Sequence, residues 1–270
     1  MPSFALIGAA RGVGLELVRQ LSANADNTVI VTVRNIEKST HIRELQQSRN
    51  GNIHIVEADV IDQHTMDRAA AEAAKVTGGS LDVLIHNAAR MEKENMIKGF
   101  LDYETPEKLD AELIASFNVN VLGAIHAINA FLPLLRKGTT KKILVMGTEG
   151  GDIGMVRKSR MSNSVAYGVT KAAEHMVATK FAAELESDGF TVVSISPGFV
   201  DVSGTAVEPM PGTTEESKPI VEKIMKGIFS AYPKAAMISP EESGRRLLSF
   251  LESMGPAENG TFVRSPEFRD

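Results

Sequence analysis

Short apolar runs alternate along the chain with longer segments in which apolar residues recur at helical spacing. Several of the runs contain no polar position, as at Val29, Ile30 and Val31. Continuous apolar runs are typical of parallel strands that are covered on both faces of a sheet. The predicted strands span residues 4–8, 28–33, 53–57, 81–86, 142–147, 191–196 and 261–264.

The helical pattern is clearest in five segments. The last of them starts with Ser239 as a cap, Pro240 in the first turn and Glu241 after it, which is a strong helix start. Strands and helices therefore alternate, which predicts an α/β fold: one Rossmann-type domain over residues 1–270, a doubly wound parallel sheet flanked by helices. The predicted helices span residues 14–24, 62–76, 107–136, 163–188 and 240–254.

One long segment, residues 202–240, breaks this alternation. It is rich in proline, glycine, threonine, serine and glutamate. Irregular segments of this length are uncommon inside a compact domain unless they have a functional role. We expect it to form a flap that covers a substrate and contains one or two short helices.

Composition and charge narrow the possible chemistry. A formal net charge of −5 gives no basic surface for nucleic acid, and the lack of cysteine excludes disulfides and zinc–cysteine sites. None of the histidines pairs with acids in a metal-ligand pattern, so no metal is expected. The apolar stretch 119–135 carries Asn120, His126 and Pro133, which predicts a buried helix rather than a membrane span. A cytoplasmic protein is the default expectation.

A glycine-rich turn follows the first predicted strand and opens the first predicted helix. It contains Gly8, Gly12 and Gly14, with Val13 between the last two. In dinucleotide sites such glycines permit a sharp turn, a close approach to the pyrophosphate and tight helix packing. The helix start also offers unpaired N–H groups to phosphates. A simple tight turn is the alternative, but the position between a strand and a helix favours a dinucleotide site.

The end of the second strand indicates which dinucleotide is bound. NAD sites commonly place an acid there, whereas this chain has Val33 followed by Arg34. Arg11 adds a second cation within the glycine turn. Two guanidinium groups suit a ribose 2′-phosphate, so we expect NADP(H), the alternative being two solvated surface arginines.

Tyr167 and Lys171 lie four residues apart, so they share one face of a helix. A tyrosine hydroxyl has a pKa of about 10, which is high for proton transfer at neutral pH. A nearby ammonium favours the phenolate, so we expect Lys171 to lower the pKa of Tyr167. Tyr167 then acts as the general acid or base. A surface tyrosine–lysine pair is the alternative.

These patterns together resemble the short-chain dehydrogenase/reductase family over nearly the whole chain, and its C-factor and sniffer-type carbonyl reductases in particular. The resemblance implies that Lys171 binds the nicotinamide ribose, and that Asn120 holds a water that connects Lys171 to solvent. It also implies that Val200 orients the nicotinamide through its backbone. The matching motifs are Gly8, Gly12 and Gly14; Asp59 and Val60; His86, Asn87, Ala88 and Ala89; Asn120; Tyr167 and Lys171; and Pro197, Gly198 and Val200.

The chain departs from the family pattern at several of these positions. Thr148 replaces the serine that binds the substrate oxygen, and it retains a hydroxyl. Ser162 and Ser164 are weaker substitutes, on or beside an expected loop over residues 152–163. Val202 stands where a nicotinamide-contacting threonine is usual. Asp59 either bonds the adenine or caps a turn, and His86 is expected to make a structural hydrogen bond.

These observations predict an NADP(H)-dependent oxidoreductase that transfers a hydride between nicotinamide and a small carbonyl or alcohol substrate. A catalytically drifted NADP-binding regulator or scaffold is the alternative, and an epimerase or dehydratase is a more distant one. The long helices carry more apolar surface than one sheet face needs, which favours a homodimer or homotetramer. The substrate itself is not encoded in any of these patterns.

Overall fold

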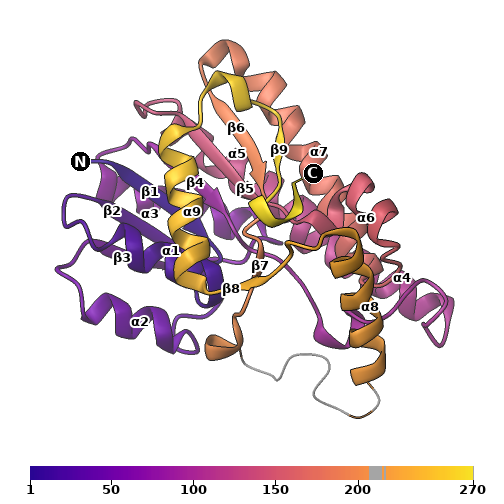
Figure 1. Ribbon diagram of the computed structural model, residues 1–270. Coiled ribbons are helices and arrows are strands. Elements are labelled where there is room, and N and C mark those ends of the chain that lie inside the picture. Colours follow the sequence, from indigo (N-terminus) through magenta and orange to yellow (C-terminus); the bar gives the residue numbers. More distant parts are fainter. Residues whose placement is uncertain (207–214, 216, 270) are drawn as a thin grey trace.

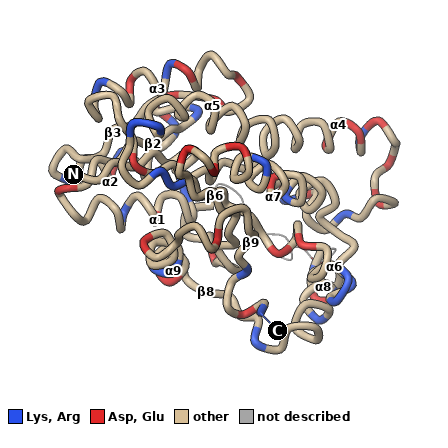
Figure 2. Tube along the Cα trace, turned by 90° about the horizontal axis from the view of Figure 1, so that it is seen from above, with Lys and Arg blue, Asp and Glu red and all other residues tan. Residues whose placement is uncertain are grey.

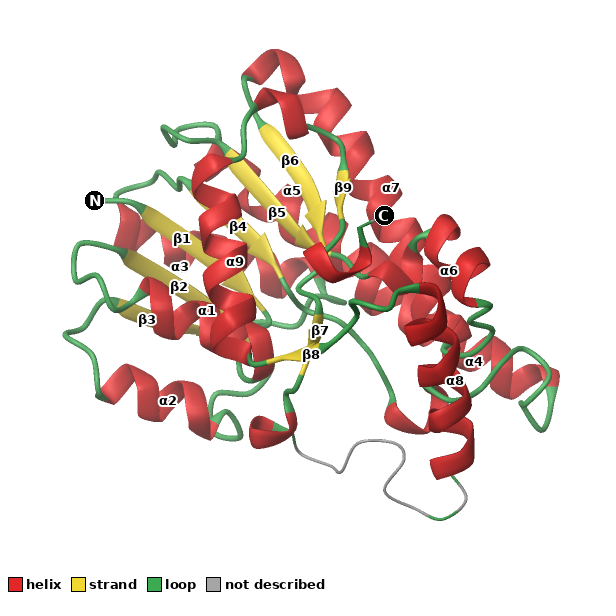
Figure 3. Ribbon diagram, viewed as in Figure 1, coloured by secondary structure: helices red, strands yellow, loops and turns green. Residues whose placement is uncertain are grey.

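The computed structural model describes residues 1–206, 215 and 217–269. Its centre is a seven-stranded, all-parallel sheet in the order β3-β2-β1-β4-β5-β6-β9 (Figures 1 and 3). The α/β class and the doubly wound sheet are therefore confirmed. The strands are β1 (Ser3–Ile7), β2 (Thr28–Val33), β3 (Ile53–Glu57), β4 (Val83–His86), β5 (Lys142–Met146), β6 (Thr191–Ile195) and β9 (Phe262–Val263). A separate parallel pair joins β7 (Phe199–Val200) to β8 (Met237–Ile238).

Helices cover both faces of the sheet. In Figure 1, α1 and α9 lie in front of it, and α3, α5 and α7 lie behind. The helices are α1 (Gly12–Leu21), α2 (Thr40–Gln47), α3 (Gln63–Thr77), α4 (Pro106–Phe117), α5 (Gly123–Leu135), α6 (Ile153–Ser159), α7 (Val165–Leu185), α8 (Lys218–Ala231) and α9 (Pro240–Ser253).

Alternate residues of each strand enter two separate apolar cores. Leu6 and Leu144 pack with α1 and α9, whereas Ile7, Leu84 and Val145 pack with α3, α5 and α7. Apolar side chains on both faces explain why the strand sequences are continuously apolar. Charged residues of both signs are scattered over the outer helices and loops (Figure 2). The residues with candidate chemical roles therefore lie outside these cores, in the segments that follow the carboxyl ends of the strands.

The long predicted helix over residues 107–136 is one continuous helix interrupted by a π-helical turn, Asn118–Leu122. By length and composition, Pro106–Leu135 is apolar enough to cross a membrane, but half of its most apolar window is buried inside the molecule. It packs on the sheet and on α3 as a core helix. π-turns are rare and often mark functional sites, and this one carries Asn120.

Three segments differ from their predicted structure. The expected loop over 152–163 contains α6, because the Asp152 carboxylate accepts a hydrogen bond from the Met155 N–H at 2.7 Å and starts a helix. Helix α2 escaped prediction because only Ile42 and Leu45 of its eight residues are buried. The expected flap contains a 14-residue helix, α8, rather than only short ones. Residues 207–214 and 216 of the flap lie outside the described residues.

Candidate functional site

The candidate site lies where the strand order reverses, at the carboxyl ends of β1 and β4. Gly8 follows β1 and Asn87 follows β4. The Asn87 side-chain amide donates to the Gly8 carbonyl at 2.7 Å, and the Asn87 N–H donates to the Ile7 carbonyl at 3.0 Å. Open α/β sheets bind ligands in the crevice at such a switch point. Asn87 therefore has the structural role of joining the two loops that flank this crevice.

The glycine turn is packed too closely for side chains. A Cβ on Gly8 would lie 2.6 Å from Ala88, and a Cβ on Gly14 would lie 2.5 Å from the Asn87 amide nitrogen. The turn therefore brings bare backbone N–H groups to the start of α1, as a pyrophosphate requires. Val13 lies in the first turn of α1 and is half-buried.

We expect Gly8→Ala to reduce both stability and dinucleotide binding. Gly8 and Gly51 share a φ of +80°, but nothing lies within 4 Å of a Cβ on Gly51. The Gly51→Ala control therefore carries only backbone strain, about 1 kcal/mol, while Gly8→Ala adds overpacking against Ala88, for a total of about 2–4 kcal/mol. Thermal unfolding of both variants measures the difference. Equal losses would show that the close approach to Ala88 has no energetic weight.

The residues around the adenosine end fit a 2′-phosphate. Val33 is 3% exposed and offers no acid, whereas Arg11 and Arg34 are exposed. Within the described residues, neither guanidinium has an ion-pair partner. Val60 is buried, and the Asp59 carboxylate accepts a hydrogen bond from the Ile61 N–H at 3.2 Å. Asp59 thus caps a turn, which is one of the two roles that the sequence predicts for it.

Tyr167 and Lys171 lie together on the N-terminal half of α7. The Lys171 ammonium lies 5.7 Å from the centre of the Tyr167 ring and donates to the Met146 carbonyl at the end of β5 at 2.7 Å. Lys171 is 2% exposed, so the surface-pair alternative is wrong. Tyr167 also borders a narrow cavity lined by Arg90, Met91 and Met96 among others.

The electrostatics of Tyr167 differ from the sequence expectation. Burial raises the pKa of its hydroxyl, and the Lys171 ammonium lowers it without outweighing burial. The Glu174 and Glu149 carboxylates add to the rise. The expectation of a lowered pKa is therefore wrong for this structure. The sequence indicates that Lys171 lies near Tyr167, but it does not indicate that Glu174 and Glu149 are buried near the same hydroxyl.

Thr148 follows β5 and caps the short 3-10 helix Glu149–Gly151. Its hydroxyl accepts from the Gly150 N–H at 3.3 Å, which leaves its own hydrogen for another acceptor. Ser162 is exposed, and the Ser164 hydroxyl donates to the Met96 carbonyl at 2.5 Å. Thr148 therefore remains the best placed of the three hydroxyls.

Asn120 is fully buried in the π-helical turn and is bonded on both sides. Its oxygen accepts from the Arg90 N–H at 2.6 Å, and its amide donates to the Thr170 hydroxyl at 2.9 Å and to the Arg90 carbonyl at 3.2 Å. These contacts hold α7 against the loop after β4. Asn120 thus positions the helix that carries Tyr167 and Lys171.

The segment after β6 turns back toward the glycine loop. Gly198 has a φ of +88°, and the Pro197 carbonyl accepts from the Ser243 hydroxyl at 2.7 Å. Val200 pairs with Ile238 in the β7–β8 ribbon. Beyond Val202, the Thr205 hydroxyl accepts from the Gly12 N–H at 2.9 Å. Thr205 therefore connects the flap directly to the start of α1.

Sequence reasoning missed three residues of this site: Glu149, Glu174 and Thr205. The Glu149 carboxylate accepts from the Ser196 hydroxyl at 2.5 Å and from the Ser265 N–H at 2.8 Å, joining β5, β6 and the C-terminal segment. Glu174 could have been found, because it lies one helical turn beyond Lys171. The partners of Glu149 and Thr205 lie far away in sequence, and no local pattern indicates them.

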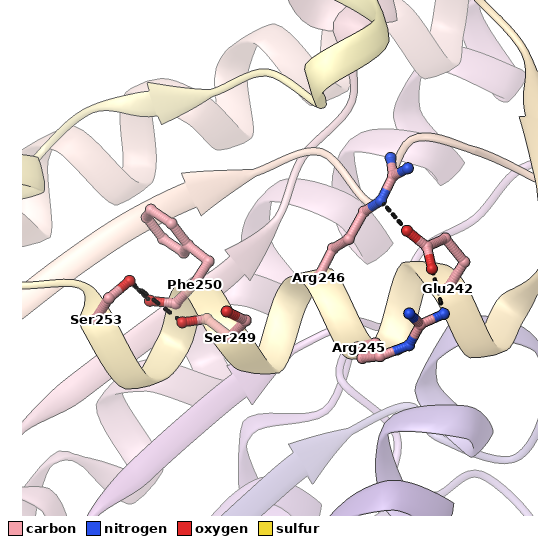
Figure 4. A pocket seen from close by; sticks show the side chains of 6 residues that line it. All are labelled: Glu242, Arg245, Arg246, Ser249, Phe250 and Ser253. Carbon is pink, nitrogen blue, oxygen red and sulfur yellow. Dashed lines mark hydrogen bonds and ion pairs between the residues drawn. The ribbon is translucent and has the colours of Figure 1, made fainter.

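A second hollow, of about 370 Å³, runs along α9 on the outside of the molecule. Figure 4 shows that Arg245 and Arg246 both point at Glu242 there. The carboxylate is therefore neutralised, and the remaining lining residues are Ser249, Phe250 and Ser253. This hollow is lined by neither a tyrosine nor a lysine, so it offers no counterpart of the Tyr167–Lys171 pair.

Comparisons with known proteins identify the family of the chain. A model of the short chain dehydrogenase family matches residues 4–210. The chain is 37% identical over 264 residues to the short-chain dehydrogenase/reductase atnB of Arthrinium sp., covering 96% of each. It is 35% identical over 254 residues to the short-chain dehydrogenase/reductase AacuF of Aspergillus aculeatus, covering 94% of this chain and 92% of the relative.

Two solved structures share the fold at lower identity. The NADPH-bound carbonyl reductase from chicken fatty liver is 23% identical, with a TM-score of 0.76 over 98% of this chain and 96% of that one. The carbonyl reductase Sniffer of Drosophila melanogaster is also 23% identical, with a TM-score of 0.75 over the same shares. With a tyrosine–lysine pair on α7, a glycine-rich turn between β1 and α1, and relatives matched over nearly its full length, the chain belongs to the short-chain dehydrogenase/reductase family of oxidoreductases.

Proposed function

We propose that this chain is an NADPH-dependent carbonyl reductase in which Tyr167 donates the proton. The observation that carries the proposal is the pairing of Tyr167 with the buried Lys171, whose ammonium lies 5.7 Å from the centre of the tyrosine ring and donates to the carbonyl at the end of β5. Because burial raises the pKa of Tyr167, its hydroxyl keeps its proton at neutral pH. A protonated tyrosine favours carbonyl reduction, in which the oxygen must gain a proton.

Each residue of the site has a proposed role in cofactor binding or in proton transfer. NADPH, when bound, supplies the hydride to the carbonyl carbon, and the protein supplies position and the proton. The exposed Arg11 and Arg34 guanidiniums would hold the 2′-phosphate, and the N-terminus of α1 the pyrophosphate. The Lys171 ammonium donates one hydrogen to the Met146 carbonyl and one to the Glu174 carboxylate. Its third hydrogen would bind the nicotinamide ribose. Thr148 would donate to the substrate oxygen while Tyr167 transfers its proton to it.

The loop after β4 contributes Met91 and Met96 to the narrow cavity beside Tyr167. Met155 on α6 is buried with Tyr232 and Phe268, and Met161, which follows α6, packs against the same cluster. Methionine side chains adapt to apolar ligands of varied shape. We infer a largely apolar carbonyl substrate, covered by the segment 202–240 acting as a flap.

The test is the loss of reduced-nicotinamide absorbance with NADPH and NADH in parallel, over a panel of aldehydes, ketones and quinones. Turnover that prefers NADPH is the expected result. Preference for NADH would overturn the cofactor assignment and leave the reductase intact. NADPH binding without turnover of any panel member would favour the binding-protein alternative.

We also propose that α4 and α7 form an interface between two copies of the chain. Large apolar side chains are exposed on these helices and on the π-helical turn between α4 and α5. A contiguous exposed apolar surface often marks a site where another protein binds. These exposed side chains are Ile114, Phe117, Leu122, Val169 and Met176. A monomer in analytical ultracentrifugation at micromolar concentration would contradict this proposal.

A further inference from the structure

A buried chain of ionisable groups extends from Lys171 away from the crevice. The Lys171 ammonium and the Glu174 carboxylate are 2.5 Å apart, and the other Glu174 oxygen lies 3.2 Å from Nδ1 of His86. Glu174 and His86 are fully buried, and Lys171 nearly so. Three ionisable side chains in one dry contact are costly unless they compensate each other. The arrangement therefore needs an explanation beyond packing.

The hydrogen bonds fix the direction of this chain. The Nε2 atom of His86 is buried and, within the described residues, has no partner. A buried acceptor is left unpaired more readily than a buried donor, which assigns the proton to Nδ1 and makes His86 a donor to Glu174. Glu174 thus accepts from His86 on one oxygen and from Lys171 on the other. Its carboxylate is held in one orientation by both.

The sheet explains why these residues meet. His86 ends β4, and its side chain lies on the same face as Leu84, under α5 and α7. Glu174 lies one turn after Lys171 on α7 and faces the same strand end. Where the family motif has its first asparagine, this chain has His86. The histidine ring reaches the carboxylate that α7 carries.

We propose that Glu174, oriented by His86, is a positioning residue for the Tyr167–Lys171 pair: it neutralises the buried ammonium and fixes it between α7 and the end of β5. The proposal rests on the proposed function, because it concerns the same proton donor. A neutralised ammonium stabilises the tyrosine anion less than a free one does. The pair therefore keeps its proton to higher pH, which biases the chain toward reduction.

The other charged groups around the pair leave this role to Glu174. Burial lowers the pKa of His175 to about 4, so the ring is neutral in the working range. Glu149 is bonded to Ser196 and Ser265. The remaining groups are already paired with each other: Arg90 with Glu112, and Asp152 with Arg264.

The sign of the effect on Tyr167 follows from the charge that is removed. Glu174→Gln removes a negative charge beside the Tyr167 phenol and the Lys171 ammonium, each of which can lose one proton. With Lys171 as an ammonium, the phenolate is no longer opposed by the carboxylate and forms more easily. The apparent pKa of Tyr167 therefore falls in the variant, by about one pH unit.

The sequence allows a direct measurement without any substrate. The chain has three tyrosines and no tryptophan, so Tyr103→Phe with Tyr232→Phe leaves Tyr167 as the single source of tyrosinate absorbance. In this background, a tyrosinate midpoint about one pH unit lower in Glu174→Gln than in Glu184→Gln is the expected result. Glu184 is exposed on the same helix and serves as the matched control. Circular dichroism at each pH separates titration from unfolding.

A midpoint in Glu174→Gln that is equal to or higher than that in Glu184→Gln would overturn the proposal. If Glu174→Gln does not fold, His86→Ala and His86→Asn replace it. Asparagine keeps a donor near the Nδ1 position, so His86→Asn should restore the parent midpoint that His86→Ala lowers. No difference between these two variants would overturn the role of His86. Because the titration needs no turnover, a failed carbonyl assay and a failed titration remain distinguishable.

Discussion

Tyr167→Phe is expected to lower the turnover of a carbonyl substrate by about 10³-fold, within the range that a positioned general acid contributes. The ring and its packing against α7 remain, and only the hydroxyl that donates the proton is lost. Since Tyr167 is not expected to hold the phosphates, NADPH binding should stay within about twofold of the parent, an order-of-magnitude expectation. Steady-state turnover and NADPH fluorescence titration measure the two effects separately.

Tyr232→Phe is the control for this variant. Tyr232 is buried against Phe268 in a separate apolar cluster, so removal of its hydroxyl tests the general effect of losing a buried phenol oxygen. Turnover in this control should match the parent. If Tyr167→Phe retained parent turnover, the tyrosine would have no chemical role and the proposed mechanism would fail.

Cofactor selectivity is expected to depend on Arg34 and Arg11. On the proposed assignment, each guanidinium would form charge-assisted hydrogen bonds with the 2′-phosphate, worth about 1.5–3 kcal/mol. Arg34→Ala should therefore raise the Kd for NADPH about 10–100-fold and leave the Kd for NADH unchanged. The double variant with Arg11→Ala should lose most of the preference. Isothermal titration with both dinucleotides gives the ratio directly.

Arg68→Ala provides a control of equal charge change. Arg68 is exposed on α3 and belongs to none of the segments assigned to the dinucleotide. It tests whether removing any positive charge weakens the binding of a polyanion. A parallel loss of NADH affinity in Arg34→Ala would show that the arginine supports the fold of the site rather than the 2′-phosphate.

The fold was largely predictable because strand residues carry their burial in their own sequence. Runs such as Ile143, Leu144 and Val145 are apolar on both faces, which only a covered parallel strand requires. The segments that escaped prediction, α2 and α6, are short and bury few of their own residues. Their apolar pattern is therefore too weak to indicate a helix, and the only local signal for α6 is the cap that Asp152 provides.

The candidate site was predictable only in part, for a related reason. Tyr167 and Lys171 are recognisable because their spacing places them on one helical face. The partner of Lys171, Glu174, lies three residues away, but the second contact of Glu174 is His86, which is 88 residues distant. The rise in the pKa of Tyr167 follows first from the burial of its own hydroxyl, which only the fold shows. Local spacing thus identifies the reacting groups, and the tertiary contacts decide their charge.

The contact between Thr205 and Gly12 has a consequence for the timing of the catalytic cycle. The Gly12 N–H lies at the start of α1, and the Thr205 hydroxyl accepts its hydrogen bond. A phosphate oxygen that takes this N–H must displace the threonine, and the threonine regains it when the dinucleotide leaves. Binding and release of the dinucleotide then each exchange one hydrogen-bond acceptor of the Gly12 N–H for another. A rearrangement of the segment that carries Thr205 would therefore accompany each binding and each release of the dinucleotide.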